Sequence, residues 1–167
     1  MDLEMSTLAQ TAACAAFGPG SLIELDMGFC PVERVCEGDL VQTRSHGSFP
    51  ALAVEINTFW MGHVVRHPHH KPVRLRAGCL GGERPWRDLI VSPGHPVLLQ
   101  GALAMRHFGE VEIAAPAAAL LKLSGVEQVS ASKITYCRLL FERPVEIRGE
   151  GVWCSAEARS APMRLTG

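Results

Sequence analysis

The sequence of 167 residues has almost no net charge and contains no long hydrophobic run. It carries 16 Lys and Arg residues against 17 Asp and Glu residues, a formal net charge of -1. This balance gives no broad attraction for a phosphate backbone, so we expect no nucleic-acid partner. No stretch of about 20 apolar residues occurs, which excludes a membrane-spanning helix. The hydrophobic share of 47% excludes intrinsic disorder and indicates one globular domain.

The cysteines lack the close spacing that marks a zinc ribbon or a thioredoxin-like site, because no CxxC pair occurs. We therefore expect free, mostly buried thiols, which fit a reducing compartment. The N-terminus lacks the basic segment and apolar run of a secretory signal peptide. This predicts a cytoplasmic protein, or one exported by a non-classical route as part of a larger protein. The six cysteines are Cys14, Cys30, Cys36, Cys79, Cys137 and Cys154.

Frequent Gly and Pro residues, 16 and 11 in number, leave short apolar runs and favour a β-rich fold. The clearest strand is Ala51 to Thr58, where apolar and polar residues alternate with a period of two. The best helix candidate is Pro116 to Leu123, with Gly125 as a stop. Residues 1 to about 13 and from about 158 onward are expected to be mobile or to be fragments of flanking regions. Further strands are expected at Ser21 to Leu25, Pro31 to Val35, Leu40 to Thr43, Pro72 to Leu75, Leu89 to Val91, Val97 to Leu99, Ile134 to Leu140 and Val145 to Ile147.

Three short motifs follow one another between residues 16 and 43. They are Ala16-Phe17-Gly18-Pro19-Gly20-Ser21-Leu22-Ile23, then Pro31-Val32-Glu33-Arg34-Val35, then Glu37-Gly38-Asp39-Leu40-Val41-Gln42-Thr43. Together they resemble the opening of a Hint domain, the fold shared by Hedgehog autoprocessing domains and inteins. That opening usually reads Cys-Phe-x-x-Gly-Thr-x-Ile, then Val-Glu-x-Leu, then Gly-Asp-x-Val-x-Thr.

The resemblance continues in the later parts of the chain. Leu89-Ile90-Val91-Ser92-Pro93-Gly94-His95 is similar to the Leu-x-Val-Ser-Pro-x-His block of the bacterial Hint subfamily, and Tyr136 to Arg143 is similar to its closing strand pair. The resemblance implies an all-β, intein-like horseshoe of many short strands with pseudo-two-fold halves. It would span residues 16–157, with residues 1–15 as an upstream flank or linker and residues 158–167 as a C-terminal tail.

The resemblance also implies a self-cleaving activity that needs no cofactor or metal. In an active Hint domain the thiol of the first residue attacks the preceding carbonyl and forms a thioester by an N-to-S acyl shift. A histidine supplies a proton to the departing amide nitrogen, and a hydroxyl helps to hold the strained carbonyl. Ser92 and His95 resemble that pair. The only substrate implied is the flanking polypeptide of the same chain, and we expect a monomer.

Two departures from the family pattern put this activity in doubt. Ala16 occupies the position of the nucleophilic cysteine, and a methyl group cannot attack a carbonyl. Cys14 is a candidate for a shifted nucleophile, but a displacement of two extended residues is about 7 Å. Pro144 stands where the subfamily often has a histidine after an acidic-Arg pair that corresponds to Glu142 and Arg143. The sequence therefore leaves two hypotheses, an autoprocessing domain that is inactive or trapped in this chain, and a catalytically dead Hint fold that serves as a binding or structural module of a larger bacterial protein.

One histidine cluster, His67-Pro68-His69-His70, could in principle bind a divalent metal. The X-Pro steps at Pro68 and Pro72 instead favour an extended, solvated loop, and no carboxylate or Cys partner closes a site. We expect no metal site there.

Overall fold

The computed structural model describes residues 3–60 and 70–159. Strands dominate, and two helices and two 3-10 turns accompany them in these ranges. The helices are α1 (Leu3–Ala13) and α3 (Gly101–Phe108), and the 3-10 turns are η1 (Val32–Arg34) and η3 (Ala117–Leu120). The strands are β1 (Leu22–Leu25), β2 (Gly28–Pro31), β3 (Leu40–Gln42), β4 (Ser48–Pro50), β5 (Ala53–Trp60), β6 (Val73–Leu75), β7 (Leu89–Val91), β8 (Pro96–Gln100), β9 (Glu112–Pro116), β10 (Val126–Gln128), β11 (Lys133–Phe141), β12 (Val145–Gly149) and β13 (Val152–Ala158).

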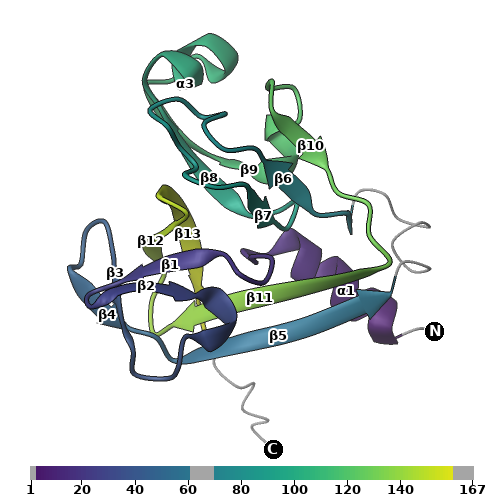
Figure 1. The fold of residues 1–167 in the computed structure, drawn as a ribbon, viewed down its shortest axis with the longest axis vertical. Helices are drawn as coiled ribbons and strands as arrows, with labels where there is room; N and C mark the ends of the chain where they lie inside the picture. The colour runs from purple at the N-terminus through teal and green to yellow at the C-terminus, as the bar shows by residue number, and fades with distance from the viewer. Residues whose placement is uncertain (1–2, 61–69, 160–167) are drawn as a thin grey trace, which may run out of the picture.

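Two sheets organise the described part of the chain. The larger has 10 strands, with the central order β4-β3-β1-β12-β13-β11-β5, and the smaller has the order β10-β6-β7. Most neighbours are antiparallel, but β11 and β13 pair in parallel, with Leu140 opposite Glu157. Figure 1 shows α3 and β6 to β10 in one part of the molecule, and α1, β1 to β5 and β11 in the other. This architecture confirms the predicted all-β fold class.

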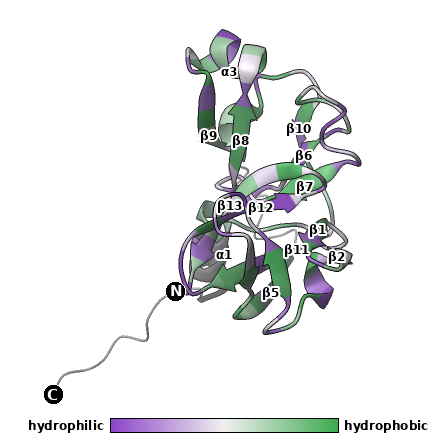
Figure 2. Ribbon diagram, turned by 90° about the vertical axis from the view of Figure 1, so that its left-hand side faces the viewer, coloured by the Kyte–Doolittle hydropathy of each residue, from purple (hydrophilic) through white to green (hydrophobic). Residues whose placement is uncertain are grey.

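Hydrophobic side chains fill the interior of both parts. In Figure 2, green segments run through strands such as β8 and β5. The main core is built from residues of both parts, including Phe17, Ile23, Val73, Val97, Leu120, Phe141 and Ile147. A second, smaller cluster consists of Leu8, Ala16, Phe59, Ile134 and Tyr136. The smaller cluster places residue 16 in an apolar environment next to helix α1.

Several predicted strands are confirmed, because period-two patterns and turn residues are local signals. Leu89 to Val91 forms β7 with the predicted bounds, and the alternating segment from Ala51 forms β5 two residues further along. The prediction for Pro31 to Val35 was wrong, since β2 ends at Pro31 and a 3-10 turn follows.

The helix predictions needed the largest corrections. Pro116 to Leu123 is not a helix, because Pro116 ends β9 and only a 3-10 turn of Ala117–Leu120 follows. Of this segment only Pro116 takes part in the pairing of β9 with β8, opposite Pro96. The N-terminal segment, expected to be mobile, contains α1, and the unpredicted α3 ends before Gly109, whose φ of 72° caps it. Among the described residues, no helix combines the length and the apolar character needed to cross a membrane.

Candidate functional site at residues 12 to 17

The residue after position 16 is anchored by backbone pairing on two sides. Phe17 forms isolated bridges with Val91 of β7 and with Cys137 of β11. Its N–H donates to the carbonyl of Cys137 over 2.8 Å, and its carbonyl accepts from the N–H of Cys137 over 2.7 Å. The N–H of Gly18 donates to the carbonyl of Ile90. These pairs hold the chain between β7 and β11 and leave Ala16 fully buried.

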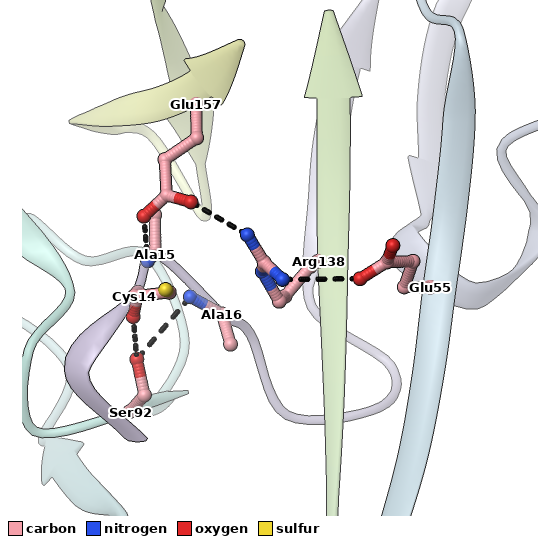
Figure 3. A network of polar contacts seen from close by, with 7 residues as sticks. All are labelled: Cys14, Ala15, Ala16, Glu55, Ser92, Arg138 and Glu157. Atoms are coloured by element: carbon pink, nitrogen blue, oxygen red, sulfur yellow. Dashed lines mark hydrogen bonds and ion pairs between the residues drawn. The ribbon is translucent and has the colours of Figure 1, made fainter. Parts of the chain in front are cut away.

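Ser92 contacts the chain on both sides of Ala15. It follows β7 directly, and its N–H donates to the carbonyl of Ala16 over 2.9 Å. The Ser92 hydroxyl donates to the carbonyl of Cys14 over 2.5 Å and accepts from the N–H of Ala16 over 3.2 Å, as Figure 3 shows. The peptide nitrogen between Ala15 and Ala16 is therefore in direct contact with a buried hydroxyl.

A carboxylate holds the nitrogen of Ala15. Oε1 of Glu157 accepts from the N–H of Ala15 over 2.9 Å, and Oε2 pairs with Nη2 of Arg138 at 2.6 Å. Nη1 of Arg138 pairs with Glu55 at 3.0 Å, so the three charges form a chain across the strands (Figure 3). Sequence reasoning missed all three residues. Glu55 and Arg138 lie directly opposite each other in the β5–β11 register, which a period-two pattern cannot reveal.

His95 lies in a different environment from Ser92. Its ring is fully buried and packs edge-to-face against Phe17, with ring centroids 4.5 Å apart. Neither ring nitrogen has a hydrogen-bond partner within residues 3–60 and 70–159. Burial lowers the pKa of His95 from 6.5 to about 3, because the interior disfavours the charged ring. The imidazole is therefore neutral at physiological pH.

The sequence profile of the Hint domain family matches residues 15–158. The chain belongs to the Hint domain family. Solved structures agree in fold. A splice-inactive variant of the AceL NrdHF class 3 split intein has a TM-score of 0.50 at 10% identity, covering 87% of this chain and 99% of its own. The MchDnaB-1 intein has a TM-score of 0.50 at 8% identity, and the match covers 84% of this chain and 99% of the intein.

A bacterial intein-like domain from Clostridium thermocellum is also similar, with a TM-score of 0.48 at 13% identity, covering 85% of this chain and 98% of that domain. A comparison with curated proteins found no match. The family match confirms the resemblance seen in the sequence and supports an autoprocessing-type domain in general terms.

The structure brings together only some of the residues predicted for a Hint site. Ser92 and Ala16 are in contact, whereas His95 is linked to the same turn through its backbone N–H, which donates to the carbonyl of Ser92. Cys14 lies beside this contact, and burial raises the pKa of its thiol, aided by the nearby Glu157 carboxylate. A protonated thiol is a weak nucleophile.

Arg143 and Pro144 take part in none of the polar contacts described for this site. The Arg143 guanidinium lies 5.7 Å from the centre of the Phe49 ring, and Pro144 lines a surface hollow of about 430 Å³ together with Arg44 and His46. Of the histidine cluster, His67 and His69 lie outside the described residues. Within the described ranges no group of three metal-binding side chains occurs.

The six cysteines are free thiols, as predicted, but the expectation that most of them are buried was wrong, since only two are. Cys137 and Cys154 are buried, Cys36 is exposed and the other three are half-buried. Burial raises the pKa of the Cys137 thiol to about 11 and that of Cys154 to about 12. None of these cysteines occupies position 16, where the sequence resemblance places the family's nucleophile.

Proposed function

We propose that the chain is an autoprocessing Hint domain whose self-cleavage at the Ala15–Ala16 bond is blocked because Ala16 replaces the nucleophilic cysteine. In this proposal residues 16–157 form the catalytic unit, and residues 1–15 form the acyl-donating flank. The observation that carries it is the position of Ser92, whose hydroxyl contacts the carbonyl before Ala15 and the nitrogen after it. Such a contact serves acyl transfer because it binds the nitrogen that must depart.

The missing step is an N-to-S acyl shift. With a cysteine at position 16, its sulfur attacks the carbonyl carbon of Ala15, a C–S bond forms and the C–N bond of the peptide breaks. The thiol proton replaces the acyl group on the nitrogen of residue 16, which leaves a free amine. An added thiol or hydroxylamine then displaces the sulfur and releases residues 1–15 as a thioester or a hydroxamate. No oxidant, reductant or cofactor is needed.

The two retained polar residues have separate roles in this proposal. Ser92 contacts the departing nitrogen and the carbonyl of Cys14. His95 relays the thiol proton to that nitrogen, because a neutral imidazole has one ring nitrogen that accepts a proton and one N–H that donates. This role for His95 rests on the family resemblance and on its place beside Phe17, the residue that follows position 16.

The test is the Ala16→Cys variant with a folded reporter fused before residue 1. We expect cleavage before residue 16 that depends on an added thiol or hydroxylamine, and intact-mass measurement detects the two fragments. Cleavage should be lost when Ser92→Ala or His95→Ala is added. Ala15→Cys is the matched control, because it introduces the same thiol one residue away at another buried position. A folded Ala16→Cys variant that stays whole with every nucleophile would refute the proposal.

A second candidate is a catalytically dead Hint fold that serves as a binding or structural module. The observation that favours it is the packing of the Ala16 methyl group in one apolar cluster with Leu8, Phe59 and Tyr136. In this second candidate Ala16 serves as a core residue, and a binding or structural role requires no nucleophile at that position. The same experiment separates the two candidates, since only a latent catalyst is cleaved when the thiol is supplied.

A further inference from the structure

We propose that helix α1 is a resident part of this domain, bound by a surface that the Ser92–His95 turn and strand β11 form for it. The upstream segment would then stay bound after the Ala15–Ala16 bond is cut, so that cleavage yields a nicked complex and does not release the flank. The cleaved state rests on the proposed function, whereas the binding of α1 in the intact chain does not.

The apolar contact of α1 is one-sided. Leu8 is 0% exposed and Ala12 is 2% exposed, whereas Ala9 and Gln10 face the solvent. Leu8 belongs to the small cluster whose other members, Ala16, Phe59, Ile134 and Tyr136, all lie downstream of the bond in question. Removing residues 1–15 would expose these apolar side chains to water, which opposes dissociation.

Polar contacts tie the end of the helix to the same surface. The carbonyl of Ala12 accepts from the N–H of Gly94 over 2.8 Å, which satisfies one of the carbonyls that a helix end leaves without an internal partner. The carbonyl of Cys14 and the N–H of Ala15 bond to Ser92 and Glu157. Each of these bonds joins the upstream segment to residues that would remain in the other fragment.

The fit at Gly94 shows that the turn is shaped for this helix. A Cβ atom added to Gly94 would lie 2.4 Å from the carbonyl oxygen of Ala13 and 2.5 Å from its carbonyl carbon. The φ of Gly94 is not positive, so the backbone itself does not require glycine. Glycine at position 94 instead leaves the space in which the C-terminal end of α1 packs.

Hydrogen exchange on the intact chain tests the binding of α1. We expect Leu8→Glu to raise exchange in residues 133–141 and 92–95 at least tenfold, while residues 22–50 stay protected. Gln10→Glu is the matched control, because it adds the same charge to the exposed face of the same helix, and it should leave exchange unchanged. Gly94→Ala should resemble Leu8→Glu. If Leu8→Glu unfolds the whole domain while Gln10→Glu folds normally, the helix is required for folding, which also supports the proposal.

Native mass spectrometry of the cleaved Ala16→Cys variant tests retention. The two fragments should remain together after treatment with hydroxylamine, and Leu8→Ala should increase the dissociated fraction at least tenfold. Fragments that separate while residues 22–50 stay protected would overturn the proposal, as would equal exchange in Leu8→Glu and Gln10→Glu. If Ala16→Cys is not cut, only the proposed function fails, and the exchange experiment alone decides whether α1 is a resident element.

Discussion

The chain is held in different ways before and after residue 16. Before it, the contacts come largely from side chains, with the Ser92 hydroxyl on the carbonyl of Cys14 and the Glu157 carboxylate on the nitrogen of Ala15. After it, Phe17 is held by backbone pairs with Cys137 and by ring packing.

The two sides therefore depend on different features of the chain. Backbone pairs form with almost any residue, so they give a fixed support on the downstream side. The upstream contacts depend on particular polar groups, namely the Ser92 hydroxyl and the Glu157 carboxylate. Substitutions can perturb each side separately.

The largest effect on stability is expected from Phe17→Ala, which removes the ring packing on the downstream side and keeps the backbone pairs with Cys137. Phe17 is almost fully buried in the main core, and truncation of such a ring typically costs about 3–5 kcal/mol. Guanidinium titration should show this loss. Phe29→Ala is the control, because that ring is 52% exposed, and it should have little effect. A decrease in the free energy of unfolding below about 1 kcal/mol in Phe17→Ala would show that the Phe17 ring does not stabilise the downstream side.

Ser92→Ala should remove the hydroxyl contacts with the carbonyl of Cys14 and the N–H of Ala16. It leaves the partly buried carbonyl of Cys14 without this donor, which costs about 1–3 kcal/mol. In the Ala16→Cys background we expect cleavage to slow by about 100-fold or more, measured by intact mass over time. Ser21→Ala is the matched control, since the buried Ser21 hydroxyl donates to the carbonyl of Gly18. Equal cleavage rates in the two variants would show that Ser92 is only structural.

His95 should make stability depend on pH. Because burial lowers the pKa of His95 from 6.5 to about 3, the unfolded chain binds more protons than the folded state between these values. The contribution of the buried, neutral His95 to the free energy of unfolding is complete above about pH 6.5 and is lost as the pH falls toward 3. The slope is about 1 kcal/mol per pH unit in the lower part of this range. His95→Phe should flatten the profile of unfolding free energy against pH, and parallel profiles would show that His95 is not the source.

The smallest effect is expected from Glu157→Gln. Glutamine keeps an oxygen that can accept from the N–H of Ala15 but loses the ion pair with Arg138. Because both partners are partly exposed, the loss should be below about 1 kcal/mol and should shrink in high salt. Melting temperatures at low and high salt measure this difference. Glu127→Gln, which removes ion pairs with Arg74 and Arg76 elsewhere, is the control.

Sequence reasoning located elements with strong local signals. The three apolar residues Leu89 to Val91 and the alternating segment from Ala51 were recognised because strand periodicity is encoded within a few residues. Helix α1 was missed because its residues show no strong periodic signal, and short helices depend on tertiary packing for stability. In α1 this packing comes from Leu8 and Ala12.

The same limit applied to the site. Ser92, His95 and Ala16 were predicted as site residues through ordered motifs. The link from Glu157 to Ala15 spans 142 residues, and it forms only because β11 and β13 pair in parallel next to β5. No spacing within the sequence encodes that arrangement, since many pairings of short strands satisfy the same alternation.

The sequence by itself determined the strand-rich character of this protein, its Hint motifs and the absence of a thiol at position 16. Only the tertiary structure decided that Ser92 contacts both sides of Ala15 and that His95 is neutral and without a partner in the described residues. It also decided that the upstream segment is a helix packed on the site. The reason is physical, because residue identity limits which chemistry is available, whereas burial and long-range strand pairing set the distances and pKa values on which that chemistry depends.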